Sequence, residues 1–158
     1  MAWGKAGSDT LTASGDLMTI TNLTASKFNV FLSHAIASGQ TEPVTTFNND
    51  TSTNYAYRYT TDGSGNFTGS STSLFLYTGS NTKDNLSLMY TFNIAGEEKL
   101  CIYWAVGANT AGAGTAPNRR EFVGKWANTS AQITSLTVTD NGGAGFDTGS
   151  TLKIWGSD

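Results

Sequence analysis

Few side chains in this sequence could carry out catalysis. There is one His and one Cys, and no Ser lies in a G-x-S-x-G or similar motif that would place a nucleophile beside a base. His34 lies in an alternating run and is interpreted as a core-facing or rim histidine with one hydrogen bond. Cys101 lies in a buried strand pattern, in which cysteine behaves as a small, unreactive hydrophobe. We therefore predict that this protein is not an enzyme and uses no cofactor.

Two runs of the form D-x-S-x-N, residues 50–54 and 62–66, resemble the first half of a calcium-binding loop. Both runs lack the distal bidentate Glu and the flanking helices of that motif. Asx-turns, in which the side chain accepts a hydrogen bond from the backbone two residues further on, explain both runs more simply. One Cys and one His are also too few for a zinc site of the Cys/His type within one chain. The prediction is therefore that no metal is bound.

Aromatic residues are the remaining candidates for ligand binding. The four that strand parity does not assign to the core are Tyr57, Tyr59, Trp126 and Trp155. Many β-sandwich modules bind sugar rings by stacking them on an exposed aromatic platform, so these four residues are the candidate ligand-binding set. The alternative is that their rings pack at a subunit interface or under loops.

The elements that would position these residues are strands. Apolar and polar residues alternate with a period of two, and the longest such run is 85–95. A turn at 96–98 and a second alternating run, 99–107, follow it, so we expect a hairpin. About ten runs recur with turn signals between them, and none has the period of a helix. This pattern predicts an all-β, antiparallel β-sandwich of the jelly-roll type, with a closed barrel as the alternative.

Strand parity also predicts the core and the ends of the domain. We expect the inward residues to include Leu32, Leu88, Phe92, Leu100, Ile102, Trp104, Leu136, Val138, Leu152 and Ile154. Residues 1–15 are expected to form an N-terminal arm, and residues 16–158 to form a single domain. The Gly- and Ala-rich stretch 108–118 is expected to be a mobile loop.

The composition indicates a folded protein with a weakly charged surface. Of its 158 residues, 13% are charged and 38% are hydrophobic, so the chain has enough apolar side chains to form a core. The net charge of −3 favours neither nucleic acid nor an anionic membrane as a partner. The N-terminus lacks the apolar region of a signal peptide, and no stretch is long enough for a transmembrane helix. We therefore expect synthesis in the cytoplasm, without secretion by a signal of its own.

Two segments resemble a known group of proteins. Residues 47–58, FNNDTSTNYAYR, resemble an FNxDxxxNYxxR stretch of small virion-associated proteins of tailed bacteriophages. Residues 126–156 resemble the C-terminal half of those proteins, with Trp155 where they more often have Tyr. The two segments occur in the same order as in that group and cover a little over a quarter of the chain. Neither segment carries catalytic residues.

The resemblance implies a jelly-roll component of a virion. Its short length, with a start at Met1 and no fibre-like repeat, favours a capsid decoration protein over the tip of a tail fibre. The expected partners are further copies of the chain, in a trimer, and a major capsid or other virion protein. The segments least committed to the core supply the expected assembly contacts, which are Trp3, Ala111, Gly112 and Pro117. The alternative is a carbohydrate- or receptor-binding domain whose partner is a host glycan.

Overall fold

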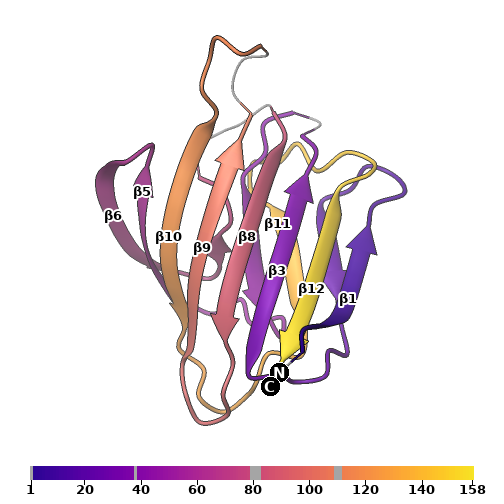
Figure 1. Cartoon of the computed structure of the whole chain (residues 1–158), viewed down its shortest axis with the longest axis vertical. Helices are drawn as coiled ribbons and strands as arrows, with labels where there is room; N and C mark the ends of the chain where they lie inside the picture. Colours follow the sequence, from indigo (N-terminus) through magenta and orange to yellow (C-terminus); the bar gives the residue numbers. More distant parts are fainter. Residues whose placement is uncertain (1, 38, 79–82, 109–111) are drawn as a thin grey trace.

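The computed structural model describes residues 2–37, 39–78, 83–108 and 112–158. These residues contain twelve β-strands and no helix, and the strands form two antiparallel sheets that pack as a sandwich (Figure 1). The strands are β1 (Gly4–Thr10), β2 (Leu17–Ile20), β3 (Phe28–Ala35), β4 (Pro43–Phe47), β5 (Tyr55–Thr61), β6 (Ser64–Ser71), β7 (Leu74–Phe75), β8 (Asn85–Phe92), β9 (Lys99–Gly107), β10 (Asn118–Trp126), β11 (Leu136–Asp140) and β12 (Thr151–Ser157). The predicted all-β sandwich is confirmed.

The order of the strands is that of a jelly roll with additions. The larger sheet has the order β1-β12-β3-β8-β9-β10-β5-β6, and the smaller sheet has the order β2-β11-β4-β7. Without the hairpin β8–β9 and the edge strands β1 and β12, the sheets β3-β10-β5-β6 and β2-β11-β4-β7 remain. This is the strand order of an eight-stranded jelly roll. The hairpin therefore widens the larger sheet between β3 and β10.

The hairpin β8–β9 forms where the sequence predicts it. Gly96 lies in the turn with a φ of 84°, in the left-handed region that favours glycine. β8 pairs with β3 along its length, and β9 pairs with β10. Because both edges of the hairpin are hydrogen-bonded within the sheet, only its two faces remain for contacts with other parts of the protein or with other molecules.

The first residues do not form a free arm, so the prediction for residues 1–15 is wrong in this respect. β1 pairs with β12 at the edge of the larger sheet, from Gly4 opposite Gly156 to Thr10 opposite Thr151. The register shifts near Gly7, where an added Cβ would overlap the Ile20 side chain of β2. β1 has small and polar residues without clear alternation. Main-chain hydrogen bonds, which do not depend on side-chain pattern, hold it in place.

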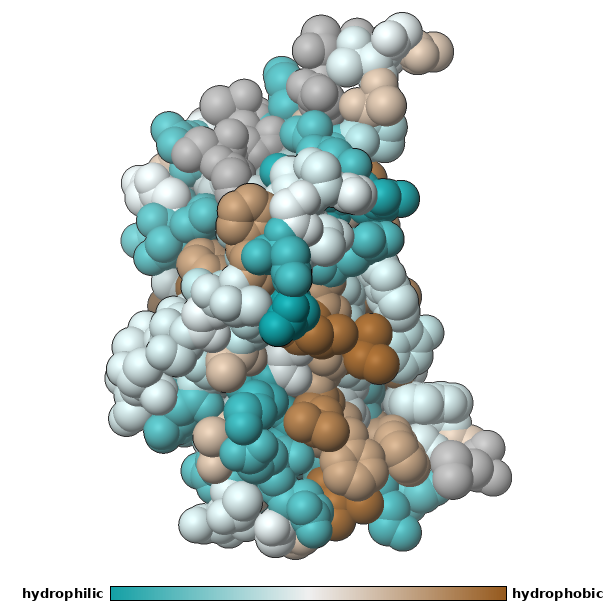
Figure 2. Space-filling model, turned by 90° about the vertical axis from the view of Figure 1, so that its left-hand side faces the viewer, coloured by the Kyte–Doolittle hydropathy of each residue, from teal (hydrophilic) through white to brown (hydrophobic). Residues whose placement is uncertain are grey.

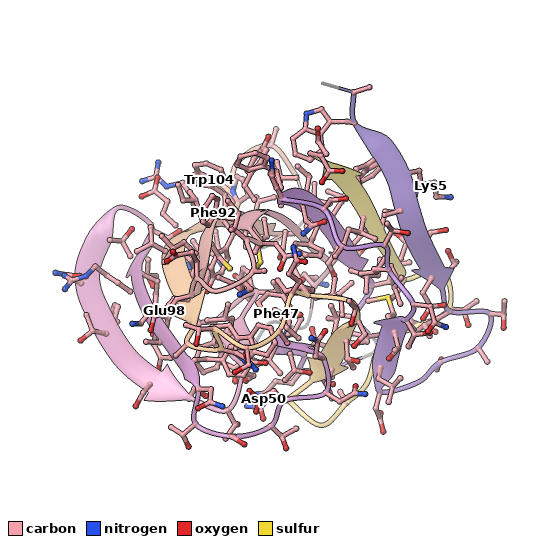
Figure 3. The ribbon with its side chains drawn as sticks, turned by 90° about the horizontal axis from the view of Figure 1, so that it is seen from below. Lys5, Phe47, Asp50, Phe92, Glu98 and Trp104 are labelled. Atoms are coloured by element: carbon pink, nitrogen blue, oxygen red, sulfur yellow. The ribbon has the colours of Figure 1, made fainter. Side chains whose placement is uncertain are left out.

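The core lies between the two sheets and is rich in aromatic rings. The ring centroids of Phe47 and Trp126 are 5.8 Å apart, and those of Tyr55 and Trp126 are 6.4 Å apart. Figure 3 shows Phe47 in the middle of the sandwich. Four of the predicted core residues are buried as expected, and these are Leu136, Val138, Leu152 and Ile154.

The other predicted core residues lie in the larger sheet and have the opposite orientation. Leu100, Ile102 and Trp104 point outward and are 46–55% exposed. The same outer side carries the partly exposed residues Leu32, Leu88 and Phe92. The inward residues of β9 are instead Cys101, Tyr103 and Ala105. Alternation identified the residues that share a face. Both faces of the hairpin carry apolar residues, however, so the pattern could not determine which face is inside.

Candidate functional site: the outer face of the larger sheet

A continuous apolar surface covers the outer face of the larger sheet. In β8 and β9 every outward side chain is large and apolar, and the exposed residues Trp3, Phe28 and Val123 lie on the same side. We call the following set the apolar outer face: Trp3, Phe28, Leu86, Leu88, Tyr90, Phe92, Leu100, Ile102, Trp104, Val106 and Val123. In Figure 3, Trp104 of this face and Asp50 lie on opposite sides of the buried Phe47.

The side chains of this face are strongly exposed. Nine of the eleven have 37–55% of their surface in contact with solvent. In the view onto the β5–β6 side, hydrophobic atoms reach the surface beside hydrophilic ones (Figure 2). Soluble monomers rarely expose a contiguous apolar patch of more than a few hundred Å², and larger patches mark interaction sites. The apolar outer face is therefore the candidate functional site.

The rings of Tyr90 and Trp104 lie between two hollows of the face. Trp104 lies directly opposite Leu88, and its ring meets that of Tyr90 edge-on, with centroids 6.3 Å apart. Toward one end, Leu86, Trp104, Val106, Pro117 and Arg119 are among the residues that line a hollow of about 640 Å³. Toward the other end, a more apolar hollow of about 420 Å³ is lined by residues that include Trp3, Phe28, Tyr90, Leu100 and Ile102.

Charged residues bound this face along β10, and they are paired with one another. The outward residues of β10 lie beside the apolar row of β9, with Glu121 opposite Trp104 and Lys125 opposite Leu100. Arg119 Nε lies 3.7 Å from Glu121 Oε1, and Lys125 Nζ lies 2.7 Å from Glu98 Oε2. The charges of β10 at this rim are thus paired within the chain. Beyond them, Arg58 of β5 lines hollows together with Ile102 and Val123, and it donates to the neutral Asn66 Oδ1 at 3.0 Å.

The inner face of the same strands is unusually polar. Several buried residues of β3, β8 and β12 face the core with polar side chains, and these are Asn29, Ser33, Asn85, Ser87, Thr91 and Ser157. Among the described residues, Asn29 Nδ2, Ser33 Oγ and both amide atoms of Asn85 have no hydrogen-bond partner. Strands normally place polar residues outward and apolar residues inward. In this part of the sheet the larger apolar side chains are outside.

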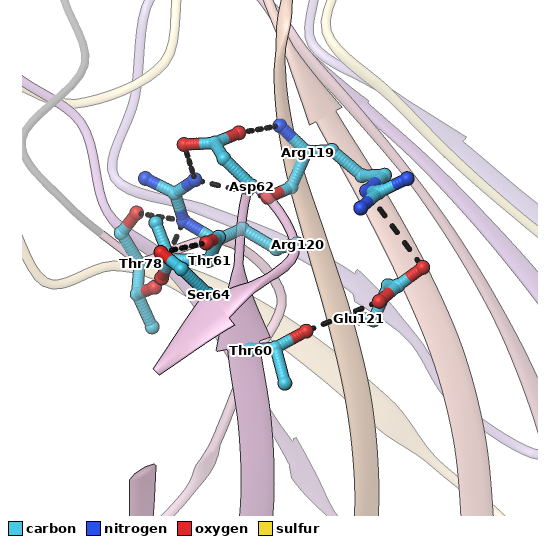
Figure 4. Close-up of polar contacts among 8 residues, drawn as sticks. All are labelled: Thr60, Thr61, Asp62, Ser64, Thr78, Arg119, Arg120 and Glu121. Carbon is cyan, nitrogen blue, oxygen red and sulfur yellow. Dashed lines mark hydrogen bonds and ion pairs between the residues drawn. The ribbon is translucent and has the colours of Figure 1, made fainter. Parts of the chain in front are cut away.

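A buried arginine anchors the turn between β5 and β6 beside this face (Figure 4). Arg120 donates to Asp62 Oδ2 at 3.1 Å and to the Thr78 carbonyl oxygen at 3.0 Å, and its guanidinium lies 5.0 Å from the centre of the Tyr77 ring. The other carboxylate oxygen of Asp62 accepts the Arg119 backbone N–H at 2.6 Å. Protein donors therefore occupy the Asp62 carboxylate, and the cluster fixes the turn to β10.

Residues 47–58 and 126–156 are joined in the fold. Trp126 donates its indole N–H to Asp50 Oδ2 at 2.7 Å, and Asn54 donates to the same oxygen at 2.9 Å. Asp50 Oδ1 accepts the Ser52 backbone N–H at 2.9 Å, which confirms the predicted Asx-turn. The Asn54 and Trp126 donors lower the pKa of Asp50 to about 2. Asn48 adds a second link, because its Oδ1 accepts the backbone N–H groups of residues 134 and 135.

The four aromatic residues predicted to bind a ligand do not form one platform. Trp126 is fully buried, so it cannot stack on a ligand. Tyr57 and Tyr59 are half-buried, with Tyr57 against Phe75. Trp155 lies on β12, which is five strands from β5 in the larger sheet, or roughly 24 Å at the usual strand spacing. Strand parity placed the exposed aromatic Trp104 in the core, and for that reason the sequence did not identify it.

The predicted assembly contacts are placed as follows. Trp3 is 49% exposed and lines the more apolar hollow. Pro117 is exposed and lines the other hollow, and Gly112 is exposed with a φ of 102°. Ala111 lies outside the described residues. Trp3 and Pro117 therefore border the apolar outer face. The large alternating apolar residues between 86 and 106 form most of that face, but from the sequence they were predicted to be core residues.

The candidates for catalysis are not assembled into a site. Cys101 is buried, which raises the pKa of its thiol to about 12, and Thr91 donates a hydrogen bond to its Sγ at 3.5 Å. His34 is half-buried on the outer side of β3, opposite Leu86. In the part of the chain that the structure describes, no group of three or more His, Cys, Asp or Glu side chains could hold a metal ion.

Comparison with protein families and with curated proteins does not identify a relative. No protein family matches this chain, and no curated protein matches it. Among solved structures, the CspB protease of Clostridium perfringens aligns with 91% of this chain at 8% sequence identity and a TM-score of 0.20. The alignment covers 25% of the protease chain, and a likeness at this score carries no argument about fold or function. Within the described ranges, no helix is long and apolar enough to cross a membrane.

Proposed function

We propose that this protein is a non-enzymatic structural protein that acts through protein–protein contacts made by the apolar outer face. One observation carries the proposal. All eight outward residues of β8 and β9 are large and apolar, whereas most of the inward residues of these strands are small or polar. Because burying apolar surface is the main favourable term in protein association, such a face favours a complex in which another molecule covers it.

The proposed setting is a virion, and the proposed role is that of a capsid decoration protein. The support for this setting is the resemblance of residues 47–58 and 126–156 to virion-associated phage proteins. The link from Asp50 to Trp126 joins these two segments in the fold. The proposed partners are a further copy of this chain and a major capsid or other virion protein.

A non-enzymatic role is part of the proposal because the chemistry of the available groups is limited. The single thiol is buried, and its raised pKa keeps it protonated at neutral pH. The single histidine lies beside Leu86 on the outer side of the sheet, and no group that would orient it as a base is identified.

A carbohydrate- or receptor-binding domain is the second candidate. The observation that favours it is the hollow of about 640 Å³ in which the exposed Trp104 ring lies near the polar side chains of Asp62 and Arg119. Aromatic rings with polar groups beside them can bind one face of a sugar and its hydroxyl groups. In this reading the partner is a host glycan.

Mass spectrometry of purified particles, together with a glycan array, tests the proposed function. Particles released from a culture that carries the gene should contain this chain in a fixed, high copy number. Absence of the chain from purified particles would refute the virion role. Glycan binding by the full chain that is lost in Trp104→Ala would favour the second candidate. In the structural role, the array should show no specific binding.

A further inference from the structure

The apolar outer face has a definite area and a definite charge, and these restrict what can cover it. Its nine most exposed residues have 37–55% of their surface in solvent. Large apolar side chains have roughly 150–250 Å² of surface each, so these nine expose on the order of 800 Å². A stable interface of standard size buries about 800 Å² on each partner. The face therefore has the area of one complete interface.

The charge around the face argues against a strongly charged partner. The rim residues of β10 are paired in cis, as Arg119 with Glu121 and Lys125 with Glu98. A nucleic acid, a polyacidic segment or a polybasic segment would need unpaired charges of the opposite sign at this rim. Arg58, which lines hollows with Ile102 and Val123, adds a single positive charge, which is too little for such a partner. A second copy of this chain brings the same apolar centre and the same ion-paired rim of β10, so it requires no such charges.

The shape of the face also suits a second copy. The rings of Tyr90 and Trp104 form its centre, and a hollow lies on each side of them along the strands. The exposed rings can enter the hollows of a copy, as self-complementary interfaces require. Twisted sheets pack face to face in this way, at a separation of about 10 Å.

We propose that the apolar outer face is covered by a second copy of this chain, packed sheet against sheet, with Ile102 and Trp104 near the centre of the contact. This inference rests on the proposed function as a structural protein, and it names the partner of the same face. Two further observations suit it. Both edges of the hairpin β8–β9 are already hydrogen-bonded, so the copies meet through side chains and not by adding strands. Trp3 would also be covered, because it lines the same hollow as Tyr90.

Sedimentation equilibrium of the full chain and of three variants tests this. One chain has a mass of 16.7 kDa, and the wild type should sediment as two chains at roughly 10 µM, within the affinity range of a standard-size interface. Ile102→Glu should weaken self-association at least about 100-fold, because an interface core rarely tolerates an unpaired charge. Because Ile102 points outward, the far-ultraviolet circular dichroism of this variant should remain that of the parent.

Two further variants serve as the control and as a milder alternative. Ser70→Glu introduces the same charge at an exposed position of β6 on the same side of the sheet, and it should sediment like the wild type. Tyr90→Ser removes a central ring without adding a charge, and it should weaken association even if Ile102→Glu does not fold. A wild type that is monomeric, or variants Ile102→Glu and Tyr90→Ser that keep the parent mass, would overturn the inference.

These results can be separated from a failure of the proposed function. A monomer that is found on particles, and whose particle binding is lost in Ile102→Glu, would retain the structural role and show that another protein covers the face. An oligomer that dissociates in Ile102→Glu but is absent from particles would retain the self-association and refute the virion role.

Discussion

Breaking the hydrogen bond between Asp50 and Trp126 should lower the free energy of unfolding by an amount that a double-variant cycle can assign to this bond. The indole N–H of Trp126 and the Asn54 amide both donate to Asp50 Oδ2, at 2.7 and 2.9 Å. In Asp50→Asn the side chain keeps its size but loses its charge and one of its two acceptor oxygens. Whichever way the new amide is oriented, an N–H group then faces one or more of the donors that Asp50 accepts.

The magnitude follows from the kind of bond that is lost. A hydrogen bond to a charged group contributes about 1.5–3 kcal/mol when it is well shielded. The Asp50 carboxyl is partly exposed, so we discount this for solvent screening and expect Asp50→Asn to cost about 1–2 kcal/mol at pH 7. Trp126→Phe removes the N–H and leaves a void, at a cost of about 1–3 kcal/mol. Because both variants remove the same bond, the double variant should lose about 1 kcal/mol less unfolding free energy than the two single variants lose together.

Urea denaturation of the parent, the two single variants and the double variant measures this coupling. The combination of Asp147→Asn with Trp126→Phe is the control, because Asp147 is bonded to Ser14 and not to the tryptophan. Its coupling energy should be zero within error. A coupling energy of zero between residues 50 and 126 would refute the interpretation that this bond stabilises the fold.

Acidification gives an independent test of the same carboxylate. The pKa of Asp50 is lowered from 3.8 to about 2 in the folded protein, so the unfolded chain binds the proton more readily. The stabilisation by Asp50 is therefore complete above pH 3.8 and declines as the pH falls toward about 2. Over that window the difference in unfolding free energy between the parent and Asp50→Asn should shrink, as measured by urea denaturation. A constant difference would contradict the lowered pKa.

Two further predictions concern the core and metal ions. Leu136→Asp should abolish soluble folding, because Leu136 is fully buried and an unpaired buried carboxylate costs several kcal/mol out of a total stability of about 5–15 kcal/mol. A soluble variant that melts like the parent would contradict this. EDTA should leave the melting temperature unchanged, because protein donors occupy the carboxylates of Asp50 and Asp62. A fall in melting temperature that calcium reverses would show a metal site.

The strands and turns of this fold could be predicted because their signals are local. Alternation over 85–95 and 99–107, with a glycine in the turn between them, identified the hairpin β8–β9. For the same reason, the predicted number of about ten strands is close to the twelve that the structure describes. β1 was missed because an edge strand of small and polar residues carries no alternation, although its backbone pairs with β12 over most of its length. Main-chain pairing of this kind is decided by the neighbouring strand, which a local pattern does not contain.

The orientation of the strands in the larger sheet could not be predicted from the sequence. Parity was right for Leu136 and Ile154, because their strands alternate apolar residues with Thr, Lys and other polar ones. In β9 the two parities read Leu, Ile, Trp, Val and Lys, Cys, Tyr, Ala, so both contain apolar residues. The assumption that the more apolar face is the inner one failed here. A chain that assembles with others can have two faces to bury.

The strand order suggests where the assembly surface of such a protein is placed. The eight strands β2–β7, β10 and β11 have jelly-roll order without the hairpin β8–β9, and the hairpin widens the larger sheet between β3 and β10. Eight of the eleven residues of the apolar outer face lie on this hairpin. Its inward residues, such as Met89 and Tyr103, complete the core, whereas its outward residues take no part in it. Substitutions on the outer side should therefore change assembly with little effect on folding, whereas substitutions one residue away should change folding first. This separation makes the comparison of Ile102→Glu with Leu136→Asp informative, because the first variant places a carboxylate on the exposed outer face and the second places one in the core between the sheets.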